Sequence, residues 1–286
     1  MLDPAWTLPA QNWCRGNPQG LPNCTWRGQL GEHWGAACGA GTPWAAFFTG
    51  YSQAVLRYAR LAQAAGVSAY LLSHELQTAV TVCPDAWLAL LRDVRAVYSG
   101  EVSTAFNPDG AALLPPAVAA APWVRQLDWI GIDCYLTPPL PPWSGGGGLS
   151  PSDVHPPLPW QDLGAAELRA AFAQLMPPYA ALAAATALPI VCTEVGWPSR
   201  PWAYAYRAGA TRLDGEDCSV TDQCVSGAAQ AAAYSAFLET YYAQPWFQGV
   251  LFWQWRADPT AGGLSDDGFV PAGKATINVT RTFWGA

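Results

Sequence analysis

The sequence predicts an α/β fold with a parallel sheet, of the kind that closes into a (β/α)8 TIM barrel. Three observations lead to this prediction. Short apolar runs alternate with helical stretches, which indicates repeated βαβ units. The runs are apolar on both faces, as in a sheet that is covered on both sides. The longest irregular segments, 136–163 and 195–225, follow the carboxyl ends of two expected strands, where such barrels carry their functional loops.

The first half of the chain contains two expected helices and two expected strands. Residues 43–65 form a helix in which Thr42 is the cap, Pro43 suits the first turn and Gly66 ends the helix. Its expected buried face consists of Phe47, Tyr51, Val55, Tyr58 and Ala62. Residues 67–73 form a strand. A helix then runs from Pro84 to Gly100, with Trp87, Leu91, Val94 and Tyr98 on one face, and 101–106 is the next strand.

The second half adds three strands, at 129–135, 188–193 and 250–255, and helices near 165–185 and 226–242, the latter capped by Ser226. The stretch between Arg169 and Glu194 has no charged residue and is long enough to span a bilayer. It contains several prolines, however, so a broken helix followed by a strand is the better interpretation, and no membrane insertion is expected.

Five strands are fewer than the eight that a closed barrel needs. Residues 1–41 are rich in Pro, Gly, Trp and Cys and resemble one long loop, which is unusual inside a compact domain. We therefore expect residues 1–286 to form one catalytic domain, with a loop-rich segment at 1–41 and barrel units at 42–286. The barrel is expected to be incomplete, with its first two to three βα units outside this chain.

Composition excludes several classes of function. The 286 residues include 14 Lys+Arg and 21 Asp+Glu, so the net charge is −7, and an acidic protein repels nucleic-acid phosphates. With 51% hydrophobic residues the chain can form a large core. Only three His and no Cys-x-x-Cys pair occur, and there is no phosphate-binding or dinucleotide glycine pattern. We expect neither a metal nor another cofactor.

The eight cysteines point to an oxidising compartment. Cys14, Cys24, Cys38, Cys218 and Cys224 lie in expected loops, and the close spacing within 14/24 and 218/224 suits short disulfide loops. Cys134 and Cys192 lie on expected strands and are interpreted as buried free thiols. Two N-glycosylation sequons begin at Asn23 and Asn278. Because Met1 and the residues after it do not form a signal peptide, we expect an extracellular or secretory-pathway protein whose start lies outside this chain.

Two glutamates each follow an apolar strand: Glu75 after the first and Glu194 after the fourth. Two strands lie between them, and in an eight-stranded barrel that spacing places two side chains across the mouth from each other. A pair of facing carboxyl groups is what glycoside hydrolysis requires: one gives a proton to the leaving oxygen, and the other attacks the anomeric carbon or activates a water. Taken singly, either glutamate could instead cap a helix or form a salt bridge.

Aromatic and polar residues at other strand ends suit a sugar site. Trp253 and Trp255 share a strand face and could stack on a pyranose, although core packing is the alternative for one of them. The hydroxyl of Tyr135 could donate to a carboxylate nucleophile. Asn107 could bind a sugar hydroxyl or form a plain turn with Pro108. His74 could adjust the acid or bind a hydroxyl, and a structural role is equally compatible with its position.

The ordered segments resemble glycoside hydrolase family 113, from about residue 26 to the end of the chain. The resemblance rests on stretches that occur in the same order in the family. In the first half they are Tyr58-Ala59-Arg60-Leu61-Ala62, His74-Glu75-Leu76, and residues 87–95 and 98–100 between Trp87 and Gly100. In the second half they are Leu127 to Tyr135, Thr193-Glu194-Val195-Gly196-Trp197-Pro198-Ser199, Phe252-Trp253-Gln254-Trp255 and Gly273-Lys274-Ala275. The family's stretch after strand three is similar to Trp26-Arg27-Gly28. Residues 193–199 also resemble the nucleophile motif of family 17 β-1,3-glucanases.

The resemblance implies a retaining endo-β-1,4-mannanase with Glu75 as acid/base and Glu194 as nucleophile. It places Tyr135 and the Trp253/Trp255 region around the reacting sugar, with Trp197 in the nucleophile motif as a further substrate-binding residue. His74 departs from the small or amide residue usual at its position. The expected partner is a β-linked polysaccharide or oligosaccharide, and a monomer is expected. The alternatives are a β-1,3-glucanase, a transglycosylase and a catalytically inactive carbohydrate-binding barrel fragment.

Overall fold

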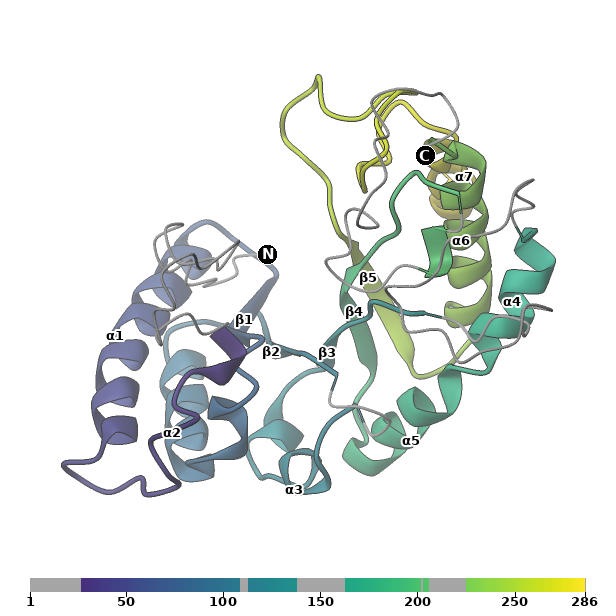
Figure 1. Cartoon of the computed structure of the whole chain (residues 1–286). Coiled ribbons are helices and arrows are strands. Elements are labelled where there is room, and N and C mark those ends of the chain that lie inside the picture. The colour runs from purple at the N-terminus through teal and green to yellow at the C-terminus, as the bar shows by residue number, and fades with distance from the viewer. Residues whose placement is uncertain (1–26, 109–112, 138–162, 202, 206–224, 286) are drawn as a thin grey trace, which may run out of the picture. The chain divides into compact units, whose positions relative to one another are not determined.

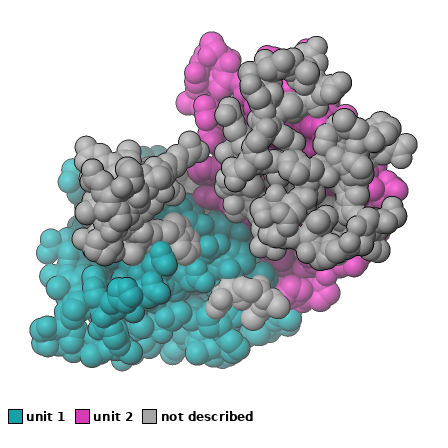
Figure 2. Space-filling model, in the orientation of Figure 1, with its two compact units in different colours: residues 1–133, 180–191 teal, residues 134–179, 192–286 magenta. Residues whose placement is uncertain are grey.

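The structure is a computed structural model that describes residues 27–108, 113–137, 163–201, 203–205 and 225–285. The chain divides into two compact units, coloured teal and magenta in Figure 2. Unit 1 comprises Met1–Asp133 and Ala180–Val191, and unit 2 comprises Cys134–Tyr179 and Cys192–Ala286. The loop cysteines 14, 24, 218 and 224 and the sequon at residue 23 lie outside the described residues. The single domain at 1–286 stays a prediction.

A five-stranded sheet with the strand order β1-β2-β3-β4-β5 forms the centre of the fold. Its strands are β1 (Ala69–His74), β2 (Glu101–Phe106), β3 (Ile130–Asp133), β4 (Ile190–Val195) and β5 (Phe247–Phe252). β1 pairs with β2 in parallel and β2 with β3 in parallel. The predicted α/β class and parallel sheet are confirmed. The described residues contain five strands, three fewer than a closed barrel requires. This agrees with the expectation of an incomplete barrel.

Two strand boundaries differ from prediction in ways that matter for function. β4 continues to Val195, so Glu194 lies within the strand rather than after it. β5 begins at Phe247, three residues before the predicted start, so Trp253 and Trp255 follow the strand instead of sharing one of its faces. The physical reason is that Gln248 and Gly249 belong to a partly exposed strand, which an apolar run does not reveal.

Unit 1 contains α1 (Pro43–Ala64), α2 (Pro84–Arg95) and the short α3 (Pro116–Ala119) (Figure 1). The hydroxyl of Thr42 accepts a hydrogen bond from the backbone N–H of Ala45, which confirms the predicted cap, and Gly66 has a positive φ after the helix. The predicted buried face of α1 is wrong at Tyr58, which is 46% exposed. The face is turned slightly, and its buried members are Trp44, Phe48, Tyr51, Val55, Ala59 and Ala62.

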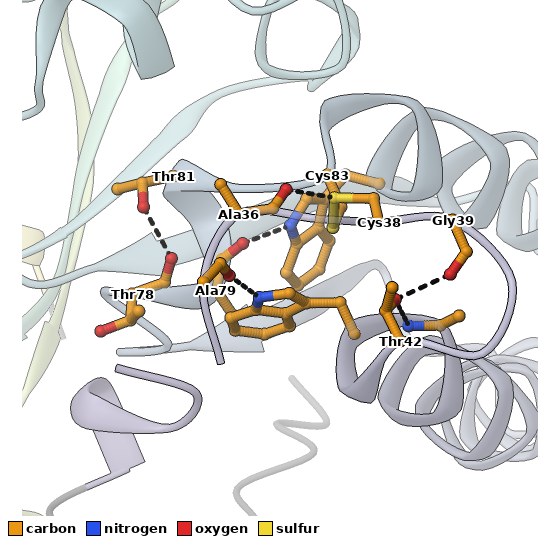
Figure 3. The surroundings of a disulfide bond; sticks show 12 residues. Ala36, Cys38, Gly39, Thr42, Thr78, Ala79, Thr81 and Cys83 are labelled. Atoms are coloured by element: carbon orange, nitrogen blue, oxygen red, sulfur yellow. Dashed lines mark hydrogen bonds between the residues drawn. A yellow bond between two sulfur atoms is a disulfide. The ribbon is translucent and has the colours of Figure 1, made fainter. Parts of the chain in front are cut away.

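A disulfide between Cys38 and Cys83 ties the segment before α1 to the start of α2 (Figure 3). The backbone N–H of Trp87 donates to the carbonyl of Cys83, and its indole donates to the backbone carbonyl of Ala79. Trp87 stacks on Trp123 at a centroid distance of 5.2 Å and meets Phe48 edge-on. The disulfide therefore lies next to an aromatic part of the core of unit 1.

The remaining long helices are α4 (Ala165–Ala173), α5 (Met176–Thr186), α6 (Gly227–Tyr241) and α7 (Thr276–Trp284). The expected break in the helix at 165–185 is confirmed, since α5 begins just before its two prolines. α6 packs against α4 and α7 within unit 2, and its cap is Ser226, as predicted. α7 was not predicted, because its Thr and Asn residues have low helix propensity. Among the described residues no helix is long and apolar enough to cross a membrane.

Candidate active site

Glu194 is held by a tyrosine that comes from the neighbouring strand segment. Tyr135 lies two residues after the end of β3, and its hydroxyl donates a hydrogen bond of 2.6 Å to Oε2 of Glu194. Glu194 is 9% exposed. This is the contact that the sequence predicted between a tyrosine hydroxyl and a carboxylate. A short bond to an ionised acceptor fixes the orientation of the carboxylate strongly.

The backbone around Glu194 is tied on both sides. Its carbonyl accepts from the N–H of Cys134 at 2.6 Å, and the next carbonyl, of Val195, accepts from the N–H of Trp253 at 2.8 Å. The interpretation of Cys134 and Cys192 as free thiols is wrong, because they form a disulfide with a Cα–Cα distance of 5.4 Å. No local sequence pattern indicates this pairing, since the two residues are 58 positions apart.

Gly196 lets the chain of Trp253 approach this strand. A Cβ at position 196 would overlap the carbonyl oxygen of Trp253, so only glycine fits without a shift of the backbone. Trp253 and Trp255 are 42% and 56% exposed. Each indole therefore offers an apolar face to solvent, as a sugar-stacking residue must.

Trp197 has a different environment. Its indole is 1% exposed and lies among Phe172, Tyr234 and Phe237, with ring centroids 5.3 to 5.7 Å away. Its carbonyl accepts from the side chain of Gln230. These are the contacts of a core residue in unit 2, and a buried indole has no face to offer a sugar. We therefore leave Trp197 out of the proposed site.

Glu75, in unit 1, directly follows β1 and adopts a left-handed backbone conformation with φ of 51°. Non-glycine residues in this region are strained, and such residues cluster at functional sites. The N–H of Glu75 donates to the carbonyl of Ala105 at 2.9 Å, which holds the turn against β2. The side chain is 12% exposed and ion-paired with Arg27, with 2.6 Å between Nη2 and Oε2.

Arg27 is a site residue that was not singled out from the sequence. It begins a short 3-10 helix, η2 (Arg27–Gln29), and the carbonyl of the next residue, Gly28, accepts from both the N–H and the hydroxyl of Thr78, at 2.8 and 2.7 Å. The segment with Arg27 is thus fixed to the segment that follows Glu75. The Trp26-Arg27-Gly28 stretch in the family resemblance was the one signal that could have drawn attention to it.

His74 lies beside Asp133, which ends β3, and Nε2 is 3.3 Å from Oδ2. Both side chains are almost completely buried, with 8% and 0% exposed. Potential ligand atoms of His74, Glu75 and Asp133 lie within 4.8 Å of one another. The guanidinium of Arg27 already occupies an oxygen of Glu75 and would repel a metal cation, so we interpret the cluster as an orienting network around Glu75.

Asn107 follows β2 and is half-buried. It lines a cavity of about 30 Å³ with Leu76, Phe106 and Pro115 among its walls, which is room for about one water molecule. The structure thus places Asn107 in unit 1, near the residue after Glu75. Lys274, part of the family resemblance, is a buried ion-pair residue: Nζ donates to Asp266 and to the carbonyl of Gly268. Burial lowers its pKa, and Asp266 opposes that effect.

Comparisons with known proteins identify what this arrangement resembles. The model of Glycoside Hydrolase Family 113 matches residues 20–274. The GH113 β-mannanase AaManA from Alicyclobacillus acidocaldarius, solved in complex with ManMIm, aligns with 91% of this chain and 69% of its own, at 22% identity and a TM-score of 0.62. Another GH113 β-1,4-mannanase aligns with 93% of this chain and 71% of its own, at 17% identity and a TM-score of 0.63. No curated protein matches the chain.

Proposed function

The chain belongs to glycoside hydrolase family 113, and from that premise we propose that it is a retaining endo-β-1,4-mannanase. It is a glycoside hydrolase, and the finer assignment concerns the substrate and the stereochemistry. One observation carries it: a glutamate follows β1 and another lies in β4, with β2 and β3 between them in the strand order. In a barrel of this type we expect the two carboxyl groups to lie about 5–5.5 Å apart, the separation of retaining enzymes.

In the proposed reaction Glu194 attacks the anomeric carbon and forms a glycosyl-enzyme ester, while Glu75 gives its proton to the departing glycosidic oxygen. Glu75 then removes a proton from a water that attacks the same carbon and releases Glu194. Tyr135 holds the Glu194 carboxylate in line for the attack through its 2.6 Å bond. The ion pair with Arg27 restrains the Glu75 side chain.

β-Mannan is the favoured substrate because the similar solved structures are described as β-mannanases. The exposed indoles of Trp253 and Trp255 suit the apolar C–H face of a pyranose, and His74 and Asn107 stay candidate partners for sugar hydroxyls. Stacking of this kind recognises a pyranose ring without selecting one linkage. The similarity of residues 193–199 to family 17 keeps β-1,3-glucan as the second substrate to test.

The test is reducing-sugar release from β-1,4-mannan and β-1,3-glucan, with Glu194→Gln as the control. We expect release from mannan, and a loss of at least a thousandfold in Glu194→Gln, because the amide cannot act as nucleophile. Release from glucan alone would move the proposal to the second substrate. No release from either polymer, by a folded protein, would support an inactive carbohydrate-binding barrel instead.

Stereochemistry is tested separately. Proton NMR of the first sugars released should show the β-anomer before mutarotation, because two inversions give net retention. Initial formation of the α-anomer would contradict the retaining mechanism. Accumulation of products longer than the substrate would indicate transglycosylation. Size-exclusion chromatography tests the expected monomer.

We also propose that the protein is extracellular or follows the secretory pathway. The two disulfides in the described residues support an oxidising compartment. Alkylation of the denatured natural protein, with and without reductant, followed by mass spectrometry, should show Cys38, Cys83, Cys134 and Cys192 protected until reduction. Free thiols at these positions would contradict the proposal.

A further inference from the structure

We propose that the Cys134–Cys192 disulfide is a positioning element of the catalytic centre, which keeps the Tyr135 hydroxyl on the carboxylate of Glu194. This inference rests on the proposed role of Glu194 as nucleophile. It adds a covalent component that ties together the strand with the nucleophile and the segment with its tyrosine.

The disulfide lies close in sequence to both Tyr135 and Glu194. Cys134 directly precedes Tyr135, and Cys192 lies two residues before Glu194 on the same strand. Three links therefore join these two short stretches: the disulfide, the 2.6 Å hydrogen bond from the N–H of Cys134 to the carbonyl of Glu194, and the 2.6 Å bond from the Tyr135 hydroxyl to the Glu194 carboxylate.

The need for such a link follows from how β3 ends. β3 has four residues and stops at Asp133, so Tyr135 lies beyond the regular hydrogen-bonding ladder. An irregular segment can shift by several tenths of an ångström at small cost, and a short hydrogen bond tolerates little of that movement. A disulfide limits the distance between its two Cα atoms, and here this constraint acts one residue away from Tyr135.

The Cys134–Cys192 disulfide lies in the protein core and not on the surface. Cys134 and Cys192 are both 0% exposed. The carbonyl of Cys134 also accepts from the N–H of Leu136, so the residues on both sides of Tyr135 are fixed. The disulfide thus restrains the tyrosine from the core side, while the tyrosine itself stays only half-buried.

The other described disulfide is a matched control. Cys38 and Cys83 are 45 positions apart and Cys134 and Cys192 are 58 apart, so the two bonds restrict the unfolded chain to a similar extent. The Cys38–Cys83 bond joins the segment before α1 to the start of α2 within unit 1, whereas Glu194 and Tyr135 belong to unit 2. Removal of either bond should destabilise similarly, and only one should disturb the nucleophile.

The experiment compares Cys134→Ala/Cys192→Ala with Cys38→Ala/Cys83→Ala, each with and without Tyr135→Phe, at a temperature where all are folded by circular dichroism. The first readout is the rate at which a 2-deoxy-2-fluoro-β-mannosyl fluoride labels Glu194. We expect the 134/192 variant to label at least tenfold more slowly, and the control within twofold of wild type. Tyr135→Phe should slow the labelling of Glu194 by a smaller factor in the 134/192 variant than in wild type, because the contact between Tyr135 and Glu194 is already weakened there.

The second readout does not need activity. In protein with carboxyl-labelled glutamate, the carbon-13 signal of Glu194 should move in the 134/192 variant toward its position in Tyr135→Phe, and stay unchanged in the control. If the 134/192 variant does not fold, Cys134→Ala/Cys192→Val, which fills more of the space, replaces it.

These outcomes distinguish the positioning role of the disulfide from the proposed function of the protein. An unchanged Glu194 signal with unchanged labelling would overturn the positioning role, as would equal losses in both disulfide variants or strictly additive effects of Tyr135→Phe. If the Glu194 signal shifts in the 134/192 variant while the wild type is neither labelled at Glu194 nor active, the positioning geometry is supported and the proposed function is rejected.

Discussion

The ion pair between Arg27 and Glu75 joins residues 48 positions apart and sets the direction of the proposed acid/base. Arg27→Met removes a charge-assisted hydrogen bond worth about 1.5–3 kcal/mol. We expect kcat/KM on mannooligosaccharides to fall by about tenfold or more, since 1.4 kcal/mol is a factor of ten. With a dinitrophenyl mannoside, whose leaving group needs no proton, the loss should be under threefold.

Arg27→Lys is the matched control, because it keeps the charge and loses the planar guanidinium. It should recover part of the activity on oligosaccharides. Equal losses on both substrates in Arg27→Met would argue against a role in orienting Glu75 and for a general structural defect.

Tyr135→Phe removes the hydroxyl that holds Glu194 and leaves the ring in place. We expect kcat on mannan to fall by about 10–100-fold with KM within threefold, because the carboxylate loses a bond that fixes its direction of attack. Steady-state kinetics measure the two constants. Tyr234→Phe is the control: its buried hydroxyl has no hydrogen-bond partner among the described residues, so both constants should stay at wild-type values.

At the scale of single elements, the contact between β4 and the segment after β5 depends on Gly196. Gly196→Ala should destabilise the protein by about 3 kcal/mol, at the upper end of overpacking effects, because the new methyl group meets backbone rather than a movable side chain. Urea unfolding measures the change, and the exposed Trp253 should shift its fluorescence.

Gly249→Ala is the control within β5, where an added Cβ meets no atom within 4 Å. Its free energy of unfolding should change by less than about 1 kcal/mol. A Gly196→Ala variant as stable as Gly249→Ala would show that the two segments lie further apart than described.

The structure also explains which element predictions succeeded. The start of α1 at Pro43 and that of α6 at Gly227 are confirmed, because Thr42 and Ser226 cap them through local hydrogen bonds. β5 was displaced by three residues, because its partly exposed residues lack an apolar pattern. The same holds for the candidate site. The contact between Glu194 and Tyr135 was predicted from the sequence, whereas the burial of Trp197 depends on helices that are distant in the sequence.

At the scale of the whole molecule, buried tyrosines set the alkaline limit of stability. Burial raises the pKa of Tyr179, Tyr234 and Tyr241 above its ordinary value of 10. Above pH 10 the unfolded chain loses these protons first, so each tyrosine lowers the free energy of unfolding by about 1.4 kcal/mol per pH unit. Lys274 acts oppositely below 10.5, since its lowered pKa makes stability rise with pH there.

We therefore expect the free energy of unfolding to fall steeply between pH 10 and 11, and Tyr234→Phe to make that slope shallower by up to about 1.4 kcal/mol per pH unit. Urea titrations at pH 9, 10 and 11 measure the slope in both proteins. An identical slope in wild type and variant would mean that Tyr234 ionises equally in the folded and unfolded chains.

The two disulfides should contribute similarly to global stability. Loop closure over 45 and 58 positions corresponds to about 4 kcal/mol for each bond in the chain-entropy description. Thermal unfolding of the two double-alanine variants should give midpoints within a few degrees of each other. A much larger loss for the 134/192 pair would reveal an additional role in the core of unit 2.

The sequence by itself determined the alternation of strands and helices, the main helix caps and the two glutamates at the carboxyl ends of the first and fourth strands, because these depend on local hydrogen bonds and on apolar runs. Only the tertiary structure decided that Arg27 pairs with Glu75, that Cys134 bonds to Cys192, and that Trp253 is exposed. Such contacts join residues tens of positions apart, and their formation depends on how whole elements pack rather than on any pattern within one segment.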